Sequence, residues 1–372
     1  MKKLKVVTIV GTRPEIIRLS ALISRLDEST DHVLVHTGQN NDFNLNEVFF
    51  RDLELREPDY FLNVDTSSMG SVMGDTIKKS EQVLRTEFPD AVMILGDTNS
   101  AIAAVVAERL QIPVYHMEAG NRSFDLNVPE ELNRRLVDHV ASFNLPYNGH
   151  SMRNLLNEGI HPRRICVTGS PMKEILQKNR QKILSSPVMG DLELEEKCFI
   201  LASIHRQENV DDLSRLESLL SYLSSLSTHF QCPVIVSTHP RTRNKMEAIN
   251  KADTEGIQFL EPFGFFDYCN LQINARMVVS DSGTVAEESA ILGFPAVTLR
   301  ESMERPEALH SGSIRMVNPG HDLAELEHFI KEVADNSTTP EGYDIDNFSW
   351  RVLNFVLSTA PLHRTWLNLN PR

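Results

Sequence analysis

The chain has 372 residues, with 37 Lys and Arg against 51 Asp and Glu, so its formal net charge is -14. At about 100–200 residues per domain, this length predicts two domains that can each bury a core. The acidic excess argues against nonspecific nucleic-acid binding, because a duplex binder presents a net basic face. Small anionic ligands remain possible, since a few arginines in a cleft can hold them.

Two further features indicate a cytoplasmic protein with no membrane partner. No stretch approaches the roughly 18 uninterrupted apolar residues of a membrane helix, and the apolar run that ends at Gly11 is too short for a signal peptide. The cysteines, at positions 166, 198, 232 and 269, have neither paired nor metal-binding spacing. We therefore expect free thiols and no metal.

Short apolar runs, bounded by Gly or polar turns and separated by helical stretches, recur along the whole chain. This alternation is typical of parallel strands buried on both faces. The expected strands of the first half are Val6–Val10, His32–His36, Ala91–Leu95, Ile112–Met117 and Ile165–Thr168. Those of the second half are Phe199–Ile204, Val234–Val236, Ile257–Leu260, Met277–Val279 and Ala296–Leu299.

The pattern predicts an α/β protein with two Rossmann-like, doubly wound domains in tandem. We place the first domain at residues 1–175, the second at 176–350, and a tail at 351–372 that packs back towards the first domain. Ligands of open parallel sheets bind beyond the carboxyl ends of the strands. The polar residues that follow each strand are therefore the candidate site.

The first such cluster is Gly11-Thr12-Arg13-Pro14-Glu15. Pro14 suits a first helical turn, whose free N–H groups favour an anion. Arg13 and Arg18 would add charged contacts to a phosphate. The alternative is an ordinary helix start with surface arginines.

Three carboxylates are candidates for acid and base chemistry. Asp97 and Glu118 each lie just after a strand, and two carboxylates there could act as general acid and base. The alternative for Asp97 is a cap on the next helix. Glu130 lies in the first turn of a helix that starts at Pro129, four residues before Arg134, and the alternative is a solvated pair of these two.

In the second half, His205 and Arg206 follow the first strand, where a His can bind a diphosphate or move a proton. Their alternative role is structural. Ser282, Gly283 and Thr284 follow a later strand, at a helix start that lets backbone amides approach a phosphate. The alternative is a capping box from Thr284 to the residue three positions on. The other residues of this predicted nucleotide pocket are Phe266, Tyr268 and Glu288.

Neither GxGxxG nor GxxxxGK[ST] occurs in the chain, which argues against NAD and P-loop chemistry. Six motifs in order instead resemble the non-hydrolysing UDP-N-acetylglucosamine 2-epimerase family, which has the glycosyltransferase-B fold. They are Gly11-Thr12-Arg13-Pro14-Glu15, Gly96-Asp97-Thr98, Glu118-Ala119-Gly120-Asn121-Arg122, Pro129-Glu130-Glu131, His205-Arg206-Gln207-Glu208-Asn209 and Asp281-Ser282-Gly283-Thr284.

Further motifs resemble one branch of that family, the UDP-N-acetyl-L-fucosamine synthases, which act on a 6-deoxy-L-talose sugar nucleotide in capsule and O-antigen assembly. Gln39 is followed by Asn40, where the glucosamine enzymes generally carry His, and the spacer from Glu118 to Glu130 is shorter than theirs. Ser123 departs from the branch, which often has Cys there. The other matching segments are Phe124-Asp125, Gly169-Ser170-Pro171-Met172 and Ser237-Thr238-His239-Pro240-Arg241-Thr242-Arg243.

The resemblance implies a cytoplasmic homodimer that epimerises C2 of a UDP-2-acetamido sugar by elimination and re-addition of UDP, without NAD, metal or other cofactor. It implies that Asp97, Glu118 and Glu130 lie near C2 and that the second domain holds UDP. Arg13, His205 and the amides at Ser282-Gly283 would stabilise the leaving diphosphate, and Arg134 would tune a carboxylate. Four alternatives remain: a UDP-N-acetylglucosamine/UDP-N-acetylmannosamine 2-epimerase, a glycosyltransferase-B transferase, a hydrolytic epimerase that releases free sugar and UDP, and a catalytically silent nucleotide-sugar binding subunit.

Overall fold

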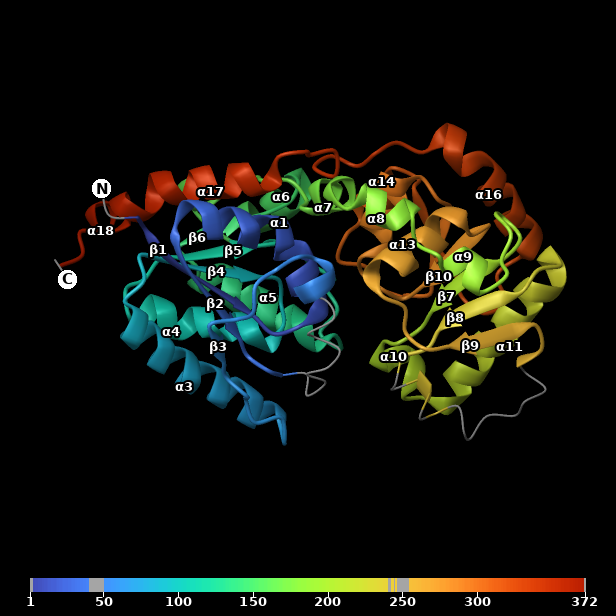
Figure 1. Cartoon of the computed structure of the whole chain (residues 1–372), viewed down its shortest axis with the longest axis horizontal. Coiled ribbons are helices and arrows are strands. Elements are labelled where there is room, and N and C mark those ends of the chain that lie inside the picture. The colour runs from blue at the N-terminus through green and yellow to red at the C-terminus, as the bar shows by residue number, and fades with distance from the viewer. Residues whose placement is uncertain (1–2, 40–49, 240–241, 244, 246–253, 371–372) are drawn as a thin grey trace. The chain divides into compact units, whose positions relative to one another are not determined.

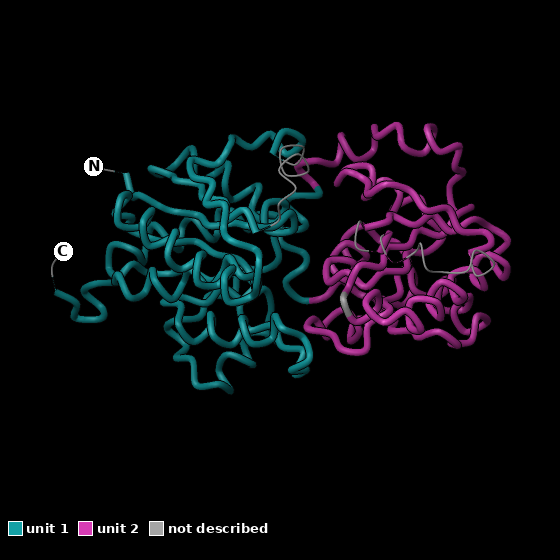
Figure 2. Tube along the Cα trace, turned by 90° about the horizontal axis from the view of Figure 1, so that it is seen from below, with its two compact units in different colours: residues 1–176, 341–372 teal, residues 177–340 magenta. Residues whose placement is uncertain are grey.

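A computed structural model describes residues 3–39, 50–239, 242–243, 245 and 254–370 of the chain (Figure 1). The chain divides into two compact units (Figure 2). Unit 1 comprises residues 1–176 and 341–372, and unit 2 comprises residues 177–340. The expected tail of residues 351–372 is thus part of a longer returning segment that starts at Glu341.

Unit 1 is built on a parallel six-stranded sheet with the order β3-β2-β1-β4-β5-β6. Three of its strands are almost entirely buried, because helices cover both faces of a parallel sheet. Its strands are β1 (Lys5–Val10), β2 (Asp31–His36), β3 (Tyr60–Phe61), β4 (Ala91–Leu95), β5 (Val114–Met117) and β6 (Phe143–Leu145).

The helices of unit 1 include the returning segment, whose α17 packs on α1. The Arg25 Nε donates to Ser349 Oγ at 2.8 Å, and the buried Tyr115 and Thr359 hydroxyls lie 2.6 Å apart. The helices are α1 (Arg13–Ser29), α3 (Met69–Glu87), η1 (Asn99–Ile102), α4 (Ala103–Arg109), α5 (Pro129–Val140), α6 (Gly149–Asn157), η2 (Pro162–Arg164), α7 (Met172–Lys178), α17 (Phe348–Thr359), η4 (Ala360–Leu362) and α18 (His363–Trp366).

Unit 2 repeats the same sheet topology, with the order β12-β11-β10-β7-β8-β9 and every pair parallel. Its strands are β7 (Ile200–Ser203), β8 (Val234–Ser237), β9 (Ile257–Leu260), β10 (Met277–Ser280), β11 (Ala296–Thr298) and β12 (Ile314–Met316). Its helices are α8 (Arg180–Leu184), α9 (Val188–Asp191), α10 (Gln207–Val210), α11 (Leu213–Phe230), α13 (Phe265–Asn274), α14 (Val285–Leu292), α15 (Glu307–His310) and α16 (Leu323–Asn336).

The predicted fold class is confirmed, but the strand at Ile165–Thr168 was wrong. Ile165 makes only an isolated bridge to Asn144, and the sixth position of the first sheet belongs to β6. The short strands β3 and β12 were not predicted. Among the described residues, no helix combines the length and apolar character that crossing a membrane requires.

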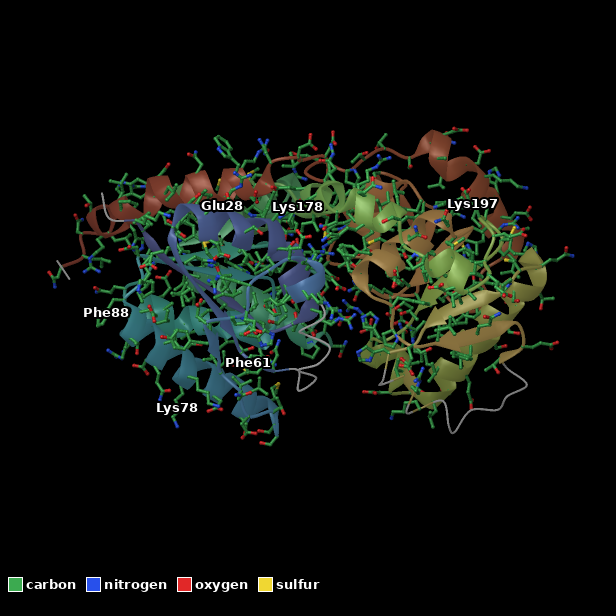
Figure 3. All side chains as sticks on the ribbon, in the orientation of Figure 1. Glu28, Phe61, Lys78, Phe88, Lys178 and Lys197 are labelled. Carbon is green, nitrogen blue, oxygen red and sulfur yellow. The ribbon has the colours of Figure 1, made fainter. Side chains whose placement is uncertain are left out.

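Two phenylalanine side chains of unit 1, Phe61 and Phe88, are labelled in Figure 3 and lie at the ends of its secondary-structure elements. Phe61 of β3 stacks on His36 at the end of β2, with ring centroids 4.7 Å apart. Burial lowers the pKa of His36 to about 4, so this ring is neutral. Phe88 caps α3 in a left-handed conformation and is 73% exposed.

Candidate functional site

In each sheet the strand order reverses direction once, between β1 and β4 in unit 1 and between β7 and β10 in unit 2. The loops that follow these strands flank a switch point, where ligands of doubly wound sheets bind. The predicted clusters after β1 and β4, and after β7 and β10, occupy these positions.

The loop after β1 differs from the prediction, because its amides are already occupied. The Glu15 carboxylate accepts hydrogen bonds from the backbone N–H of Gly11 at 2.9 Å and of Thr12 at 2.7 Å. It also accepts from the hydroxyls of Thr12 and Thr98, at 2.8 and 2.9 Å. Burial raises the pKa of Glu15 to about 7, against the lowering effect of these bonds. The amides of Gly11 and Thr12 therefore bond a carboxylate of the chain itself, and the binding of a ligand anion by this loop stays a prediction.

Arg13 and Arg18, the two arginines of α1 that were predicted to contact a phosphate, have different surroundings. Pro14 lies in the first turn of α1, as predicted. Burial lowers the pKa of the Arg13 guanidinium, which remains a cation at neutral pH. Arg18 is buried, and its Nη1 lies 3.2 Å from Glu118 Oε2. Arg18 is thus a carboxylate partner, so its predicted contact with a phosphate would compete with this pair.

Asp97 does not cap the following helix. The cap of η1 is Thr98, whose Oγ1 accepts from the Ser100 N–H at 3.2 Å. The Asp97 carboxylate instead forms an ion pair with Arg134, whose Nε and Nη2 lie 2.7 and 2.6 Å from Oδ2. These charge-assisted contacts hold the side chain at the end of β4, where it is 22% exposed.

Glu118 has a left-handed backbone, with φ of 64°, which is unusual for a residue with a side chain. Besides Arg18, its carboxylate accepts from Asn121 Nδ2 at 3.3 Å and from the Tyr147 hydroxyl at 3.4 Å. Its side chain is 10% exposed. Strained backbone of this kind is often found where a side chain is aimed into a site.

Glu130 lies in the first turn of α5 and is exposed. The alternative of a Glu130–Arg134 pair was wrong: Arg134 Nη1 contacts Glu131 Oε2 at 2.9 Å, in addition to Asp97. Glu131 is fully buried and also accepts from the Ser123 N–H at 3.0 Å. Arg134 therefore links α5 to the end of β4.

In unit 2, His205 is oriented by Asp281 from the loop after β10. Asp281 is fully buried, and its Oδ1 lies 3.1 Å from His205 Nδ1. The same carboxylate accepts from the backbone N–H of His205 and Arg206 and from Asn209 Nδ2, at 2.9–3.1 Å. This leaves Nε2 as the outward-facing nitrogen of a ring that is 37% exposed.

The loop after β10 is partly satisfied from within. The Ser282 N–H donates to Ser280 Oγ at 3.0 Å, and the Ser282 and Thr284 hydroxyls lie 3.0 Å apart. The predicted capping box is absent: Thr284 makes no cap hydrogen bond, and Glu287 pairs with Arg305 at 3.0 Å. Arg206 Nε donates to the Asp281 carbonyl oxygen at 3.0 Å.

The residues that were predicted to contact the ribose and the base lie on α13 and α14. Phe266 is half-buried, with Lys182 Nζ 5.3 Å from its ring centroid. Tyr268 packs against the apolar core of unit 2, and burial raises the pKa of its phenol. The Glu288 carboxylate is buried and accepts from Gln272 Nε2 at 2.6 Å. Glu288 must leave or share this partner to reach a ribose.

Three charged residues near Gly283 were missed by the sequence reasoning. Arg300 pairs with Glu304, and Arg305 Nη1 donates to the Gly283 carbonyl oxygen. All three side chains are buried, and burial of a charged group costs free energy unless an opposite charge or hydrogen bonds compensate it. Arg300 could have been predicted from the sequence, because it directly follows the predicted strand Ala296–Leu299. Arg13 and Asp97 were selected on the same ground, since each lies shortly after a predicted strand.

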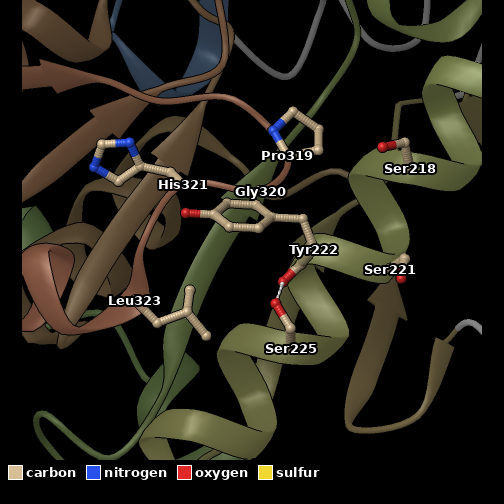
Figure 4. A pocket seen from close by; sticks show the side chains of 8 residues that line it. All are labelled: Ser218, Ser221, Tyr222, Ser225, Pro319, Gly320, His321 and Leu323. Carbon is tan, nitrogen blue, oxygen red and sulfur yellow. Dashed lines mark hydrogen bonds between the residues drawn. The ribbon is translucent and has the colours of Figure 1, made fainter.

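A pocket of about 460 Å³ in unit 2 contains none of the predicted residues (Figure 4). It lies between α11 and the segment before α16, and the Tyr222 hydroxyl points towards His321 in the figure. Its lining residues are Ser218, Ser221, Tyr222, Ser225, Pro319, Gly320, His321 and Leu323.

Asn40, Pro240 and Arg241, which belong to the predicted branch motifs, lie outside the described residues. Within the described part of the chain, no three His, Cys, Asp or Glu side chains are grouped so that they could hold a metal ion.

Two Rossmann-like units, each with polar residues at its switch point, define a class of doubly wound α/β proteins that bind ligands beyond the carboxyl ends of their strands. Comparison with known proteins narrows this class. The family model described as UDP-N-acetylglucosamine 2-epimerase matches residues 24–355. The chain therefore belongs to the UDP-N-acetylglucosamine 2-epimerase family, and it is an isomerase that acts on C2 of a UDP-sugar.

Individual relatives agree. The UDP-N-acetylglucosamine 2-epimerase of Methanocaldococcus jannaschii is 37% identical over 325 residues, 83% of this chain and 87% of that protein. The UDP-2,3-diacetamido-2,3-dideoxy-D-glucuronate 2-epimerase of Pseudomonas aeruginosa is 33% identical over 326 residues, 86% of this chain and 90% of that protein.

Among solved structures, the UDP-N-acetylglucosamine 2-epimerase from Rickettsia bellii matches with a TM-score of 0.88 and 39% identity, covering 98% of this chain and 100% of that one. The Methanocaldococcus jannaschii enzyme in complex with UDP-GlcNAc and UDP matches with a TM-score of 0.87 and 33% identity, covering 95% and 100%. The predicted glycosyltransferase-B fold is thereby confirmed.

Proposed function

We propose that the chain epimerises C2 of a UDP-2-acetamido sugar by eliminating UDP and adding it back. The observation that carries this proposal is the edge of the first sheet. Asp97 and Glu118 end neighbouring strands, and each carboxylate is held by a buried arginine. Carboxylates fixed in this way can exchange a proton with a bound sugar without moving far.

The chemistry of the substrate favours elimination. The C2 proton of a 2-acetamido sugar is not next to a carbonyl, so it is too weakly acidic for simple removal. In the elimination, a carboxylate takes the C2 proton, the C–H electron pair forms the C1–C2 double bond, and UDP leaves C1 with the C–O pair. Protonation of C2 from the other face and return of UDP to C1 give the epimer, with no net redox change and no cofactor.

The acid and base roles fall to Asp97, Glu118 and Glu130. An arginine partner favours the ionised form of a carboxylate, which is the form that a general base needs, although the same partner makes that base weaker. Glu130, exposed in the first turn of α5, is the third candidate for proton transfer at C2. Arg134 acts through Asp97 rather than on the sugar.

Unit 2 holds UDP in this proposal. Within unit 2, His205 Nε2, Arg206 and the N–H of Gly283 are the candidate contacts of the diphosphate and would stabilise its charge as it leaves. Arg13 of unit 1 is a further candidate for a diphosphate contact. Phe266, Tyr268, Thr284 and Glu288 are the candidate contacts of the nucleoside. The supporting observation is the buried Asp281, which fixes the His205 ring by its Nδ1.

For the sugar we propose UDP-2-acetamido-2,6-dideoxy-L-talose, which would give UDP-N-acetyl-L-fucosamine for capsule or O-antigen synthesis in the cytoplasm. Its support is the set of branch motifs around Glu118, Gly169 and His239. UDP-N-acetylglucosamine is a second candidate, because the names of several relatives favour it.

One experiment tests reaction and substrate together. The purified protein is incubated with each UDP-sugar in D2O, without acceptor, and C2 is followed by NMR. We expect deuterium at C2 of the product and at least tenfold faster turnover of the L-talose compound. A product without deuterium contradicts elimination, and faster UDP-N-acetylglucosamine turnover selects the second candidate. A transferase would leave the sugar unchanged, a hydrolytic enzyme would accumulate UDP, and a silent subunit would bind UDP without exchange.

We further propose that the protein works as a homodimer. Three apolar side chains of unit 1, Phe124, Leu126 and Leu132, are 67–79% exposed, as is expected of residues that a second subunit covers. Light scattering after gel filtration should give about twice the chain mass, and a monomeric mass would contradict the proposal.

A further inference from the structure

The Asp138 carboxylate on α5 is fully buried and takes part in none of the proposed steps. Its partners all come from the segment that carries Glu118. Oδ2 accepts from Arg122 Nη1 at 2.7 Å and from the Gly120 N–H at 3.1 Å, and Oδ1 lies 2.9 Å from His116 Nδ1. One carboxylate thus contacts both sides of Glu118 in sequence.

His116 extends this network to the neighbouring strand. Its Nε2 lies 2.8 Å from the carbonyl oxygen of Gly96, the residue before Asp97. A carbonyl oxygen only accepts hydrogen bonds, and so does an ionised carboxylate. A ring that faces the Gly96 carbonyl oxygen with one nitrogen and the Asp138 carboxylate with the other therefore complements both neighbours when both of its nitrogens carry a proton.

The surroundings of Asp138 favour its ionised form. Burial opposes ionisation, but the contacts with His116 and Arg122 outweigh it and lower the pKa of this carboxyl. Arg122 is shared with Glu158, whose Oε2 lies 2.6 Å from Nη2. The Asp138 carboxylate thus lies between the His116 ring and the Arg122 guanidinium, and Glu158 lies at the outer end of this network.

The segment needs such a restraint, because its backbone is strained. Glu118 and Gly120 both have positive φ, 64° and 81°. A non-glycine residue in this region is strained and persists only where its surroundings hold it. Asp138 holds the Gly120 N–H, and Asn154 Nδ2 donates to the Gly120 carbonyl oxygen at 3.0 Å.

We propose that Asp138 is a positioning residue that aligns two carboxylates at once. It fixes Glu118 through Gly120 and Arg122, and it fixes the loop of Asp97 through the protonated His116. This inference rests on the proposed roles of Asp97 and Glu118 in the epimerisation. It adds a residue outside the substrate site on which the distance between the two carboxylates depends.

The test variant is Asp138→Asn in the full chain. The Asn oxygen can still accept from Arg122 and Gly120, whereas its amide N–H would donate to His116 Nδ1, which must then be unprotonated. In protein labelled with 15N-histidine, we expect two protonated ring nitrogens for His116 in the wild type between pH 6 and 8, and one in the variant. We expect kcat to fall at least tenfold, with KM and UDP affinity within threefold.

The matched control is Glu108→Gln, which changes another carboxylate of unit 1. Glu108 accepts hydrogen bonds from the backbone N–H groups of Val114 and Ser142, whereas Asp138 contacts His116, Gly120 and Arg122. It should leave the His116 spectrum and kcat unchanged. A singly protonated His116 in the wild type, or unchanged kcat in folded Asp138→Asn, overturns the inference. Should that variant not fold, His116→Gln must show the same loss of kcat. If the wild type epimerises no UDP-sugar, the proposed function fails, while the spectra still decide the His116–Asp138 link.

Discussion

The two switch points of this protein share one topology and differ in their charges. In both units a buried carboxylate occupies the backbone amides after the first strand. Glu15 does so from within α1, and Asp281 does so from the loop after β10. In unit 1 the neighbouring side chains are carboxylates with arginine partners, whereas in unit 2 they are His205, Arg206 and buried arginines.

This difference indicates how one fold can divide a reaction between two halves. In the proposed function, the edge of unit 1 would exchange protons with the sugar, and the edge of unit 2 would hold the diphosphate. The topology alone predicts where ligands bind, and the side chains decide what each half does there. Variants of the two edges should therefore fail in different ways.

The largest effect is expected for Glu130→Gln at the edge of unit 1. The variant keeps the shape of the side chain but cannot exchange a proton, so turnover should fall at least about 10³-fold. UDP affinity, measured by calorimetry, should stay within threefold, because the proposed UDP contacts lie mostly in unit 2.

The control for this variant is Glu81→Gln, a change of a surface carboxylate on α3 that pairs with Arg85. Its turnover should equal that of the wild type. Near-normal activity of Glu130→Gln would remove Glu130 from the proton-transfer groups, and a parallel loss of UDP affinity would contradict the division between the units.

Glu15 gives a second prediction, on stability rather than turnover. The pKa of Glu15 is about 7 in the folded chain, against 4.5 for an ordinary glutamate such as that of the unfolded chain. Between these two pH values Glu15 is therefore mostly protonated in the folded chain and mostly ionised in the unfolded chain. The free energy of unfolding should therefore decrease as pH rises from about 4.5 to 7, by about 3 kcal/mol in total from this group. Glu15→Gln should remove this part of the pH dependence.

Both tryptophans, Trp350 and Trp366, lie in unit 1, so their fluorescence reports the unfolding of that unit. Urea unfolding at pH 5, 6, 7 and 8 should show the variant gaining stability relative to the wild type as pH rises. Profiles that stay parallel across this range would show that Glu15 does not titrate there. Glu81→Gln again serves as the control and should follow the wild type.

How far the sequence predicts the fold depends on the length of each strand. Ala91–Leu95 was predicted correctly because five buried apolar residues between polar turns have few other structures open to them. The three-residue β6 carries too short a pattern to be recognised, and its neighbour Ile165–Thr168 pairs with β6 only through an isolated bridge at Asn144. Strand pairing is a tertiary property that local composition does not encode.

The site shows the same limit. Residues that end strands were found from the sequence, since position in a βα unit is a local pattern. Their partners were not, because Arg134 reaches Asp97 over 37 positions and local spacing suggested Glu130 instead. Likewise, the amides after β1 were expected to be free, although Glu15 lies four residues away and folds back onto them.

The smallest of these effects is expected at the edge of unit 2, for His205→Asn. The variant loses one hydrogen bond to a charged group, worth about 1.5–3 kcal/mol, so kcat/KM should fall roughly 10- to 100-fold. UDP affinity should weaken with it, unlike in Glu130→Gln. The control His328→Asn, on the exposed face of α16, should change neither quantity. Lost turnover with unchanged UDP affinity would instead assign His205 to proton transfer, and the two edges would then share the chemistry rather than divide it.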